Sequence, residues 1–431
     1  MRLILIMSCL LLLLPAIGVS ADKQVTTLDN GLRVIIVENH QVPQVNISTT
    51  IKVGAKNESD YFDGATHLLE HLILFRGTEN MTGAEVGNAM NEHGAYFNGY
   101  TSADWTDFVI SLPSEYLDFA LQIHADMLFR SNFPKAEMDD ERHAVLEEIN
   151  ISEDSPAAKV YRASLKELYG SKHAYSKNVL GTKQNVENVS RDSLYAYYKR
   201  YYAPNNMTTV IVGDIDPVAT LELVKKYFAA FPKGEVPVDN HGTPPSRKKI
   251  ESIQIKKDVG QGYLFMGSIG PDINSPDQFT LDIMATILGD GESSRLWKKL
   301  KDEDGLVYSV GYSFETRRYE GIVYASAELD PANISAAEKA INEVLNDAKA
   351  NGFTEHELQK AKNQIKTSYY VSMERGLNVA DRYAQYDAYQ SYKFIDDYPA
   401  NIEKVTLAEL NAATRKYLNT DSYVKTTVVP K

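Results

Sequence analysis

The chain carries, in its first hundred residues, the stretch Gly64-Ala-Thr-His67-Leu-Leu-Glu70-His71-Leu-Ile-Leu-Phe-Arg-Gly77-Thr78. Residues four apart share one face of an α-helix, so the imidazoles of His67 and His71 can reach a single metal ion. Glu70 points toward the same space, where its carboxylate can handle a water on the metal. The spacing therefore predicts a helix over 64–75 that presents a metal site.

A third metal ligand must come from a separate element, because a hydrolytic zinc site uses three protein ligands and leaves one position for water. The candidate segment is Glu141-Arg-His-Ala-Val-Leu-Glu147-Glu148-Ile, which has the apolar spacing of a helix. Glu141 and Glu148 lie two turns apart on one face, whereas Glu147 is rotated by about 100° and is expected to face solvent. Spacing alone leaves each carboxylate open to the alternative of a solvated helix face.

These segments together resemble the signature of the insulinase/pitrilysin family of zinc peptidases, whose His-x-x-Glu-His order marks them as inverzincins. Glu148 follows His71 by 77 residues, the spacing at which that family places its third zinc ligand. The family also has a supporting glutamate seven residues earlier, which here is Glu141. The resemblance thus implies one Zn²⁺ per chain, held by His67, His71 and Glu148, with Glu70 as the general base.

The resemblance extends over nearly the whole mature chain, through the further segments 30–34, 98–106, 202–207, 213–216, 293–296 and 305–310. It places a substrate-binding edge strand at 95–98, where Ala95 and Asn98 are expected to bind an extended peptide by main-chain hydrogen bonds. Gly99 stands where the family usually has alanine. In the second half, Lys301 and Tyr308 match a family Arg–Tyr pair that holds the substrate backbone. A lysine lacks the planar donor fork of arginine, so either Lys301 suffices or a second chain provides the full pair.

The function implied is a zinc-dependent endopeptidase that hydrolyses peptides or small unfolded polypeptides in a closed chamber. This chain is about half of the pitrilysin arrangement, so we expect a homodimer, or a heterodimer with a homologous chain that carries the Arg–Tyr pair. The alternative is a non-catalytic core or assembly subunit of a processing-peptidase-like complex. Such subunits typically lose metal ligands, and all of them are present here. A peptide-binding module with structural zinc is disfavoured, because such sites are usually closed by four ligands and rich in cysteine.

Composition and the N-terminal residues limit the location and partners. The formal charge of −13 argues against nucleic acid, because phosphate binding needs a basic face. Residues 1–21 read as a signal peptide, with Arg2 before an apolar run and a small-residue cleavage site ending at Ala21. We therefore expect export to the periplasm or medium, with an uncleaved membrane anchor as the alternative. Cys9 is the only cysteine, so the mature chain has no disulfide.

Domain organisation follows from a repeated pattern in the 431 residues. We predict an α/β (α+β) fold of two duplicated domains, each a mostly antiparallel or mixed sheet packed by helices. Their bounds are 22–232 for the catalytic domain, 233–248 for a Pro/Gly-rich linker and 249–431 for a homologous domain without metal. The segment Phe133–Glu137 is similar in sequence to Phe353–Glu357. When the two halves are aligned on these segments, Ser368 corresponds to Glu148. The helix expected at 278–288 has no histidine, which indicates one catalytic copy.

Overall fold

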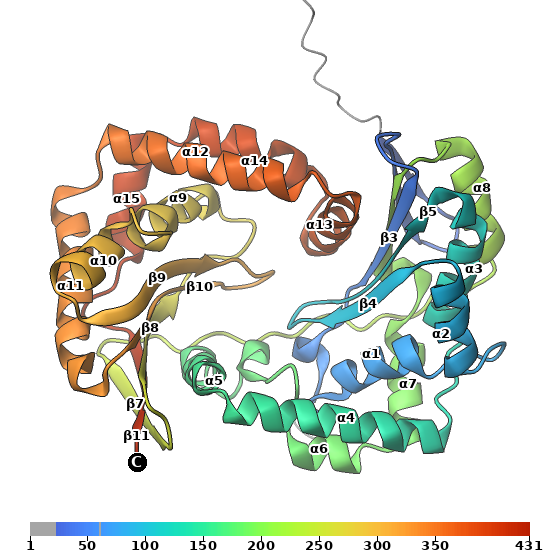
Figure 1. Ribbon diagram of the computed structural model, residues 1–431, viewed down its shortest axis with the longest axis horizontal. Coiled ribbons are helices and arrows are strands. Elements are labelled where there is room, and N and C mark those ends of the chain that lie inside the picture. Colours follow the sequence, from blue (N-terminus) through green and yellow to red (C-terminus); the bar gives the residue numbers. More distant parts are fainter. Residues whose placement is uncertain (1–22, 60–61) are drawn as a thin grey trace, which may run out of the picture.

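The computed structural model describes residues 23–59 and 62–431, which form two β-sheets surrounded by helices (Figure 1). The predicted signal peptide lies outside the described residues and stays a prediction. No helix within 23–59 and 62–431 is long and apolar enough to cross a membrane.

The first sheet has six strands in the order β1-β2-β6-β3-β5-β4. Strands β2 and β6 are parallel and the other neighbours are antiparallel. The strands are β1 (Lys23–Thr27), β2 (Arg33–Glu38), β3 (Gln44–Ile51), β4 (Tyr96–Thr101), β5 (Thr106–Pro113) and β6 (Met207–Gly213). The helices of this half are α1 (Ala65–Phe75), α2 (Gly83–Glu92), α3 (Leu117–Phe129), α4 (Lys135–Asp154), α5 (Pro156–Tyr169), α6 (Lys183–Asn188), α7 (Arg191–Tyr201) and α8 (Pro217–Phe228).

The second sheet has five strands in the order β7-β11-β8-β10-β9. The strands are β7 (Glu251–Lys257), β8 (Gly262–Ile269), β9 (Val307–Glu315), β10 (Ile322–Leu329) and β11 (Val424–Pro430). The helices are α9 (Gln278–Gly289), α10 (Arg295–Trp297), α11 (Ile334–Asn351), α12 (Glu355–Ser372), α13 (Gly376–Tyr389), α14 (Lys393–Lys404) and α15 (Leu407–Tyr417). The described chain between α8 and β7 contains neither helix nor strand, where the sequence predicts the linker.

The two halves share one topology, which confirms the predicted duplication. Apart from β1, an additional edge strand of the first half, the first strand of each half is parallel to the last, as β2 is to β6 and β7 is to β11. The last strand then pairs antiparallel with the second, and the remaining two strands follow to an edge. In chain order, α9 therefore takes the place of α1, and α12 takes the place of α4.

One helix of each half packs against the sheet of the other half, an arrangement that the sequence pattern does not predict. Helix α13 packs on the face of the first sheet that is turned toward the second half, where Ala380 and Ala384 meet Val210 and Val212 (Figure 1). Helix α5 packs on the second sheet, with Val160 and Leu168 in a cluster with residues of β8 and β11. Because these two helices bury apolar residues of the sheets in the opposite halves, each half stabilises the other.

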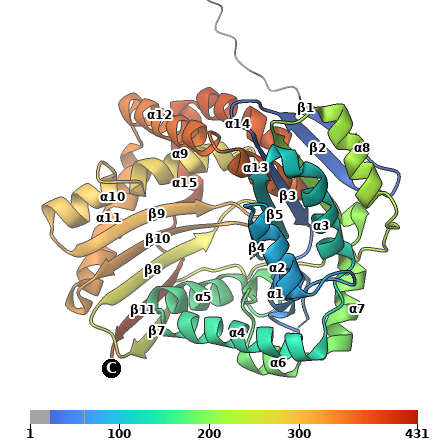
Figure 2. The ribbon, with the colours of Figure 1, turned by 45° about the vertical axis from the view of Figure 1, so that its right-hand side comes forward.

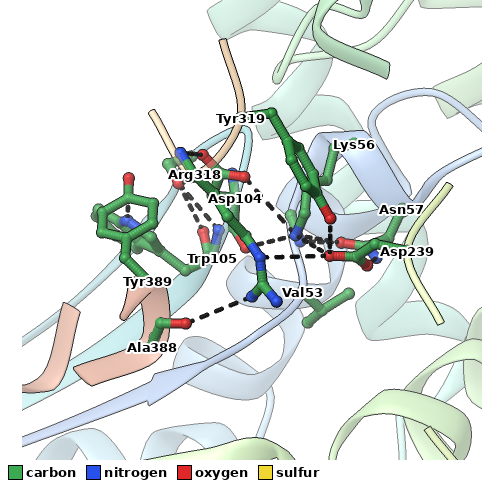
Figure 3. A network of polar contacts seen from close by, with 12 residues as sticks. Val53, Lys56, Asn57, Asp104, Trp105, Asp239, Arg318, Tyr319, Ala388 and Tyr389 are labelled. Atoms are coloured by element: carbon green, nitrogen blue, oxygen red, sulfur yellow. Dashed lines mark hydrogen bonds and ion pairs between the residues drawn. The ribbon is translucent and has the colours of Figure 1, made fainter. Parts of the chain in front are cut away.

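A buried polar network joins the two halves beside the linker (Figure 3). The carboxylate of Asp239 in the linker accepts hydrogen bonds from Asn57 and from the phenol of Tyr319, at 2.7 and 3.0 Å. It also lies 3.3 Å from the Lys56 ammonium. Burial opposes ionisation of Asp239, but the Lys56 charge and these hydrogen bonds lower its pKa. Across the same interface, the indole of Trp105 donates to the Tyr389 hydroxyl at 2.8 Å.

Candidate metal centre

Helix α1 begins at a buried turn that is held by a distant carboxylate. Gly64 precedes the helix with a left-handed φ of +92°, a conformation that favours glycine. The first free N–H groups of the helix point at Glu58, whose carboxylate accepts from Gly64 and Thr66 at 2.8 and 2.6 Å. Burial raises the pKa of Glu58 to about 8, against the lowering effect of these bonds. The bonds fix the first turn of α1, on which His67 stands.

Helix α4 lies against α1 and brings the predicted third ligand to the two histidines (Figures 1 and 2). The Nε2 atom of His67 is 3.4 Å from one oxygen of Glu148, and Nε2 of His71 is 3.6 Å from the other. One ligand atom of each of the three residues lies within 4.8 Å of the others, and no other such group occurs in the described part of the chain. Tetrahedral zinc with bonds of about 2.0–2.1 Å separates its ligand atoms by about 3.3–3.4 Å. The two histidines and Glu148 therefore fit a zinc ion.

Glu141 orients one of the histidines and is itself held by an arginine. The Nδ1–H of His71 donates to Glu141 at 2.9 Å, which leaves Nε2 of this ring directed at Glu148. Arg76 donates to the other oxygen of Glu141 at 2.6 Å. Burial opposes ionisation of Glu141, but the bond from His71 and the Arg76 charge lower its pKa. Such a carboxylate–histidine pair fixes the tautomer and orientation of a metal ligand.

The other histidine, His67, has no comparable hydrogen-bond partner among the described residues. The Nδ1 atom of His67 is buried without a hydrogen bond. Burial, with a smaller effect from the neighbouring His71, lowers the pKa of His67 to about 3. The ring is therefore neutral in the neutral pH range, which is the form that binds metal.

Glu70 lies between α1 and the edge strand β4, next to the cluster. Its carboxylate accepts a hydrogen bond from the Thr101 hydroxyl at 2.7 Å. Burial raises its pKa to about 6. A Cβ atom on Gly99 would lie 2.8 Å from Oε1 and 2.9 Å from Cγ of Glu70. Glycine at this position thus leaves room for the Glu70 side chain in its observed place.

Strand β4 forms the free edge of the first sheet beside Glu70. Tyr96 and Tyr100 are exposed on it, and the Asn98 amide donates to the Tyr96 hydroxyl at 3.3 Å. Ala95 precedes the strand, and its N–H already donates to the carbonyl of Met90. An edge strand of this kind presents unpaired main-chain groups to an extended peptide.

A cavity of about 1030 Å³ lies between the two halves. Ser102, next to Thr101, and Ile149, next to Glu148, both line it. Its other walls include α5, the segment 176–183 and residues 315–317 of the second half. The volume is at the upper end of the range for ligand sites, about 300–1,000 Å³.

Lys301 and Tyr308 lie together but are not brought to the metal cluster. Lys301 lies in a π-helical turn (Lys298–Glu303), and its ammonium donates to the carbonyl of Tyr308 at 3.0 Å. The Tyr308 side chain, at the start of β9, is exposed. Neither side chain makes a hydrogen bond or ion pair with His67, Glu70, His71 or Glu148.

Three residues of the site were missed by the sequence reasoning. Arg76 and Thr101 stand inside the segments that carry the resemblance, so their positions gave a signal that went unused. Glu58 gave none, because its bond to the start of α1 depends on a loop whose path cannot be read from residue types. Glu147 is exposed, as predicted.

Two sequence models of known families match the chain in order. The model described as "Insulinase (Peptidase family M16)" matches residues 33–183, and "Peptidase M16 inactive domain" matches residues 188–365. The chain is 28% identical over 408 residues to the "uncharacterized zinc protease" YmxG of Bacillus subtilis, covering 94% of this chain and 97% of that one.

Solved structures agree with this match. A protease from Helicobacter pylori superposes with a TM-score of 0.89 at 26% identity, covering 95% of this chain and all of that one. The periplasmic protease PqqL from Escherichia coli has the same fold, with a TM-score of 0.77 at 22% identity. That match covers 94% of this chain but only 47% of PqqL. With both halves matched in sequence and in fold, the chain belongs to the insulinase (M16) family of peptidases.

Proposed function

We propose that the protein is a zinc-dependent endopeptidase whose centre is formed by His67, His71 and Glu148. The observation that carries the proposal is the convergence of these three donors from two helices, with the buried carboxylate of Glu70 beside them. The alternative of a non-catalytic subunit gains no support here, because the first half has a full ligand set and a base.

The chemistry divides between the ion and the side chains. A zinc ion bound by such a set acts as a Lewis acid and brings the pKa of a water toward about 7. Glu70 takes a proton from the water that attacks the peptide carbonyl, and then delivers it to the departing amine. Its partly raised pKa suits a group that must both accept and release a proton near neutral pH. Thr101 holds its carboxylate toward the edge strand.

The substrate we propose is an extended peptide bound along β4. Pairing with a free edge uses main-chain hydrogen bonds and so places little demand on sequence. Asn98 and the exposed tyrosines Tyr96 and Tyr100 line this edge. The cavity between the halves provides space for residues on one side of the bond that is cut.

A second chain completes the chamber in this proposal. Tyr308 is exposed and has no contact with the metal cluster of its own chain, so it is free to serve the centre of another copy or of a homologous chain. The match to about half of PqqL is consistent with two such units enclosing one chamber. We also propose that the chain is exported through cleavage after Ala21; sequencing of the mature N-terminus tests this.

The test is to measure zinc content and cleavage of a quenched peptide for the parent and for Glu70→Gln. We expect the parent to bind one zinc per chain and to lose activity with a chelator. The Glu70→Gln variant is expected to keep its zinc and to lose about 10²–10⁴-fold in turnover. Glu92→Gln, an exposed glutamate at the end of α2, serves as the matched control and should cleave like the parent. A zinc-loaded parent without cleavage, alone or mixed with a homologous chain, would support the non-catalytic alternative.

A further inference from the structure

The second half contains a polar cavity of about 460 Å³ at the place that corresponds to the metal centre. It lies between α9 and α12, the counterparts of α1 and α4, and is closed by α13, α14 and the end of β9. Ser368, which the sequence register places opposite Glu148, lines it. None of the residues that line it is a histidine or cysteine, and the described residues here form no metal-ligating group.

Gln278, the first residue of α9, lines this cavity with an unpaired amide. Its side chain is only 1% exposed, and neither its Nε2 nor its Oε1 has a hydrogen-bond partner among the described residues. A buried amide without partners costs about 1–3 kcal/mol, so proteins rarely retain one without a reason. The group offers both a donor and an acceptor to a molecule that enters the cavity.

A carboxyl group, Asp282, and a guanidinium, Arg382, line the same cavity; burial raises the pKa of Asp282 to about 7, and an ammonium bound beside it would favour the ionised form. The carboxylate of Asp282, one turn after Gln278, accepts from the Tyr398 hydroxyl at 2.8 Å through Oδ2. Its Oδ1 accepts no hydrogen bond from a described residue. The guanidinium of Arg382, on α13, is partly buried and makes no hydrogen bond or ion pair with any residue in the described ranges. An unpaired, partly enclosed guanidinium is a ready site for a carboxylate.

The remaining walls are aromatic and rigid. The rings of Tyr386 and Phe394 stack at 4.9 Å between centroids with 9° between their planes. Phe314 closes another side. Such walls favour an apolar or aromatic side chain, while the few polar groups fix its orientation.

We propose that this cavity binds a small zwitterion, a short peptide with both ends free. Its carboxylate pairs with Arg382, its ammonium with Asp282, and its peptide group with the amide of Gln278. A phosphate is disfavoured by Asp282 and by Asp290 at the rim, and a bare metal cation by Arg382. The volume, at the small end of the usual range of about 300–1,000 Å³, suits a peptide of a few residues at most. The proposal concerns binding and does not depend on the peptidase activity.

The ligand-side test is isothermal titration calorimetry of the full chain with the dipeptide Ala-Phe, in chelator so that no hydrolysis occurs. We expect saturable binding with one site per chain. Acetylating the amino group or amidating the carboxylate should each weaken binding at least tenfold, because each removes one charge. No saturable binding at millimolar dipeptide, or equal binding of the blocked dipeptides, overturns the proposal. This comparison uses only the parent protein, so it does not depend on the folding of a variant.

The protein-side test locates the binding. Arg382→Gln and Asp282→Asn should each weaken Ala-Phe binding at least tenfold, since each removes one charge partner. Arg375→Gln is the matched control, because Arg375 is exposed at the start of α13, outside the cavity, and makes no ion pair with a described residue. It should bind like the parent. Parent-like binding by both Arg382→Gln and Asp282→Asn places the dipeptide elsewhere and refutes the site.

Discussion

Apart from the additional edge strand β1, the two halves of the molecule have the same strand order, but they carry different side chains at corresponding places. In the first half, α1 and α4 bring two imidazoles and a carboxylate together. In the second half, α9 and α12 take the corresponding positions and present an amide, a carboxyl group and a serine. The sheet pairing depends on main-chain hydrogen bonds, which tolerate these changes. The shared topology therefore provides a place for a site, and the side chains on its helices determine what the site can bind.

Both halves contain an arginine–glutamate pair that links two segments. In the first half, Arg76 at the end of α1 binds Glu141 on α4. In the second half, Arg295 on α10 forms a two-point pair with Glu357 on α12, at 2.7 and 2.9 Å. In each half the arginine follows the first long helix, α1 or α9, and the glutamate lies on α4 or on its counterpart α12. Only in the first half does its glutamate also contact a metal-site histidine.

The largest expected effect comes from removing one histidine. His71→Ala takes away a ligand atom and the partner of Glu141, so we expect loss of bound zinc together with loss of peptidase activity. Metal analysis and peptide cleavage measure both. His143→Ala, an exposed histidine on α4, is the control and should retain zinc and activity. Full zinc occupancy in His71→Ala would show that the centre lies elsewhere.

The next effect concerns the carboxylate that orients His71. Glu141→Gln keeps the side-chain shape but removes the charge that faces His71 and Arg76. Loss of such a partner typically costs about 10- to 100-fold in metal affinity or activity. A zinc competition titration measures the affinity. Glu147→Gln lies on the same helix in solvent and should match the parent; equal affinities for the two variants contradict the role given to Glu141.

A smaller effect is expected from filling the space beside Glu70, the proposed base. In Gly99→Ala, the new Cβ atom would push the Glu70 side chain out of its place. Small misplacements of a reacting group can cost up to about 10²-fold, and we expect roughly tenfold here because the end of the side chain can move. Zinc content should not change. Gly87→Ala, where a Cβ meets no atom within 4 Å, is the control, and kcat values of both variants decide.

The smallest effect is expected on stability, for Glu357 in the second half. Its counterpart in the similar segment of the first half is Glu137. Burial opposes ionisation of Glu357, but Arg295 and the N-terminus of α12 lower its pKa to about 2. Its ionised form therefore stabilises the fold above about pH 4.3, the unfolded value, and this contribution is lost as pH falls toward 2. We expect Glu357→Gln to lower the free energy of unfolding by about 1 kcal/mol at pH 7, after screening by solvent.

The matched control for that pair is Glu137→Gln, because Glu137 makes no hydrogen bond or ion pair with a described residue. Urea unfolding at pH 7 and near pH 3 measures the difference. It should shrink at the lower pH for Glu357→Gln and be close to zero at both for Glu137→Gln. A larger loss of unfolding free energy for Glu137→Gln would contradict the role given to the Glu357–Arg295 pair.

Much of the first half could be predicted, because its sequence signals are local. The spacing of His67 and His71 indicates the helix and the metal face. The sequence spacing between His71 and Glu148 identifies the third ligand only through the family resemblance. In the structure, Glu148 has carboxylate oxygens within 3.6 Å of both histidines. The duplicated topology followed from the similar order of segments, and the described strand pairs confirm it.

The rest depends on contacts that residue types do not encode. No sequence pattern indicates that α5 and α13 pack on the sheets of the opposite halves, because an apolar helix face does not show which sheet it covers. The cavity of the second half was likewise invisible, since Gln278, Asp282 and Arg382 come from separate segments and match no motif. Such sites appear only when tertiary packing sets the side chains together.

The most direct test of the central claim is a crystal structure of the zinc-loaded protein with anomalous scattering measured at the zinc edge. We expect one strong peak within about 2.0–2.2 Å of Nε2 of His67, Nε2 of His71 and a carboxylate oxygen of Glu148. A peak away from these atoms, or a zinc bound to the histidines with Glu148 turned away, would contradict it.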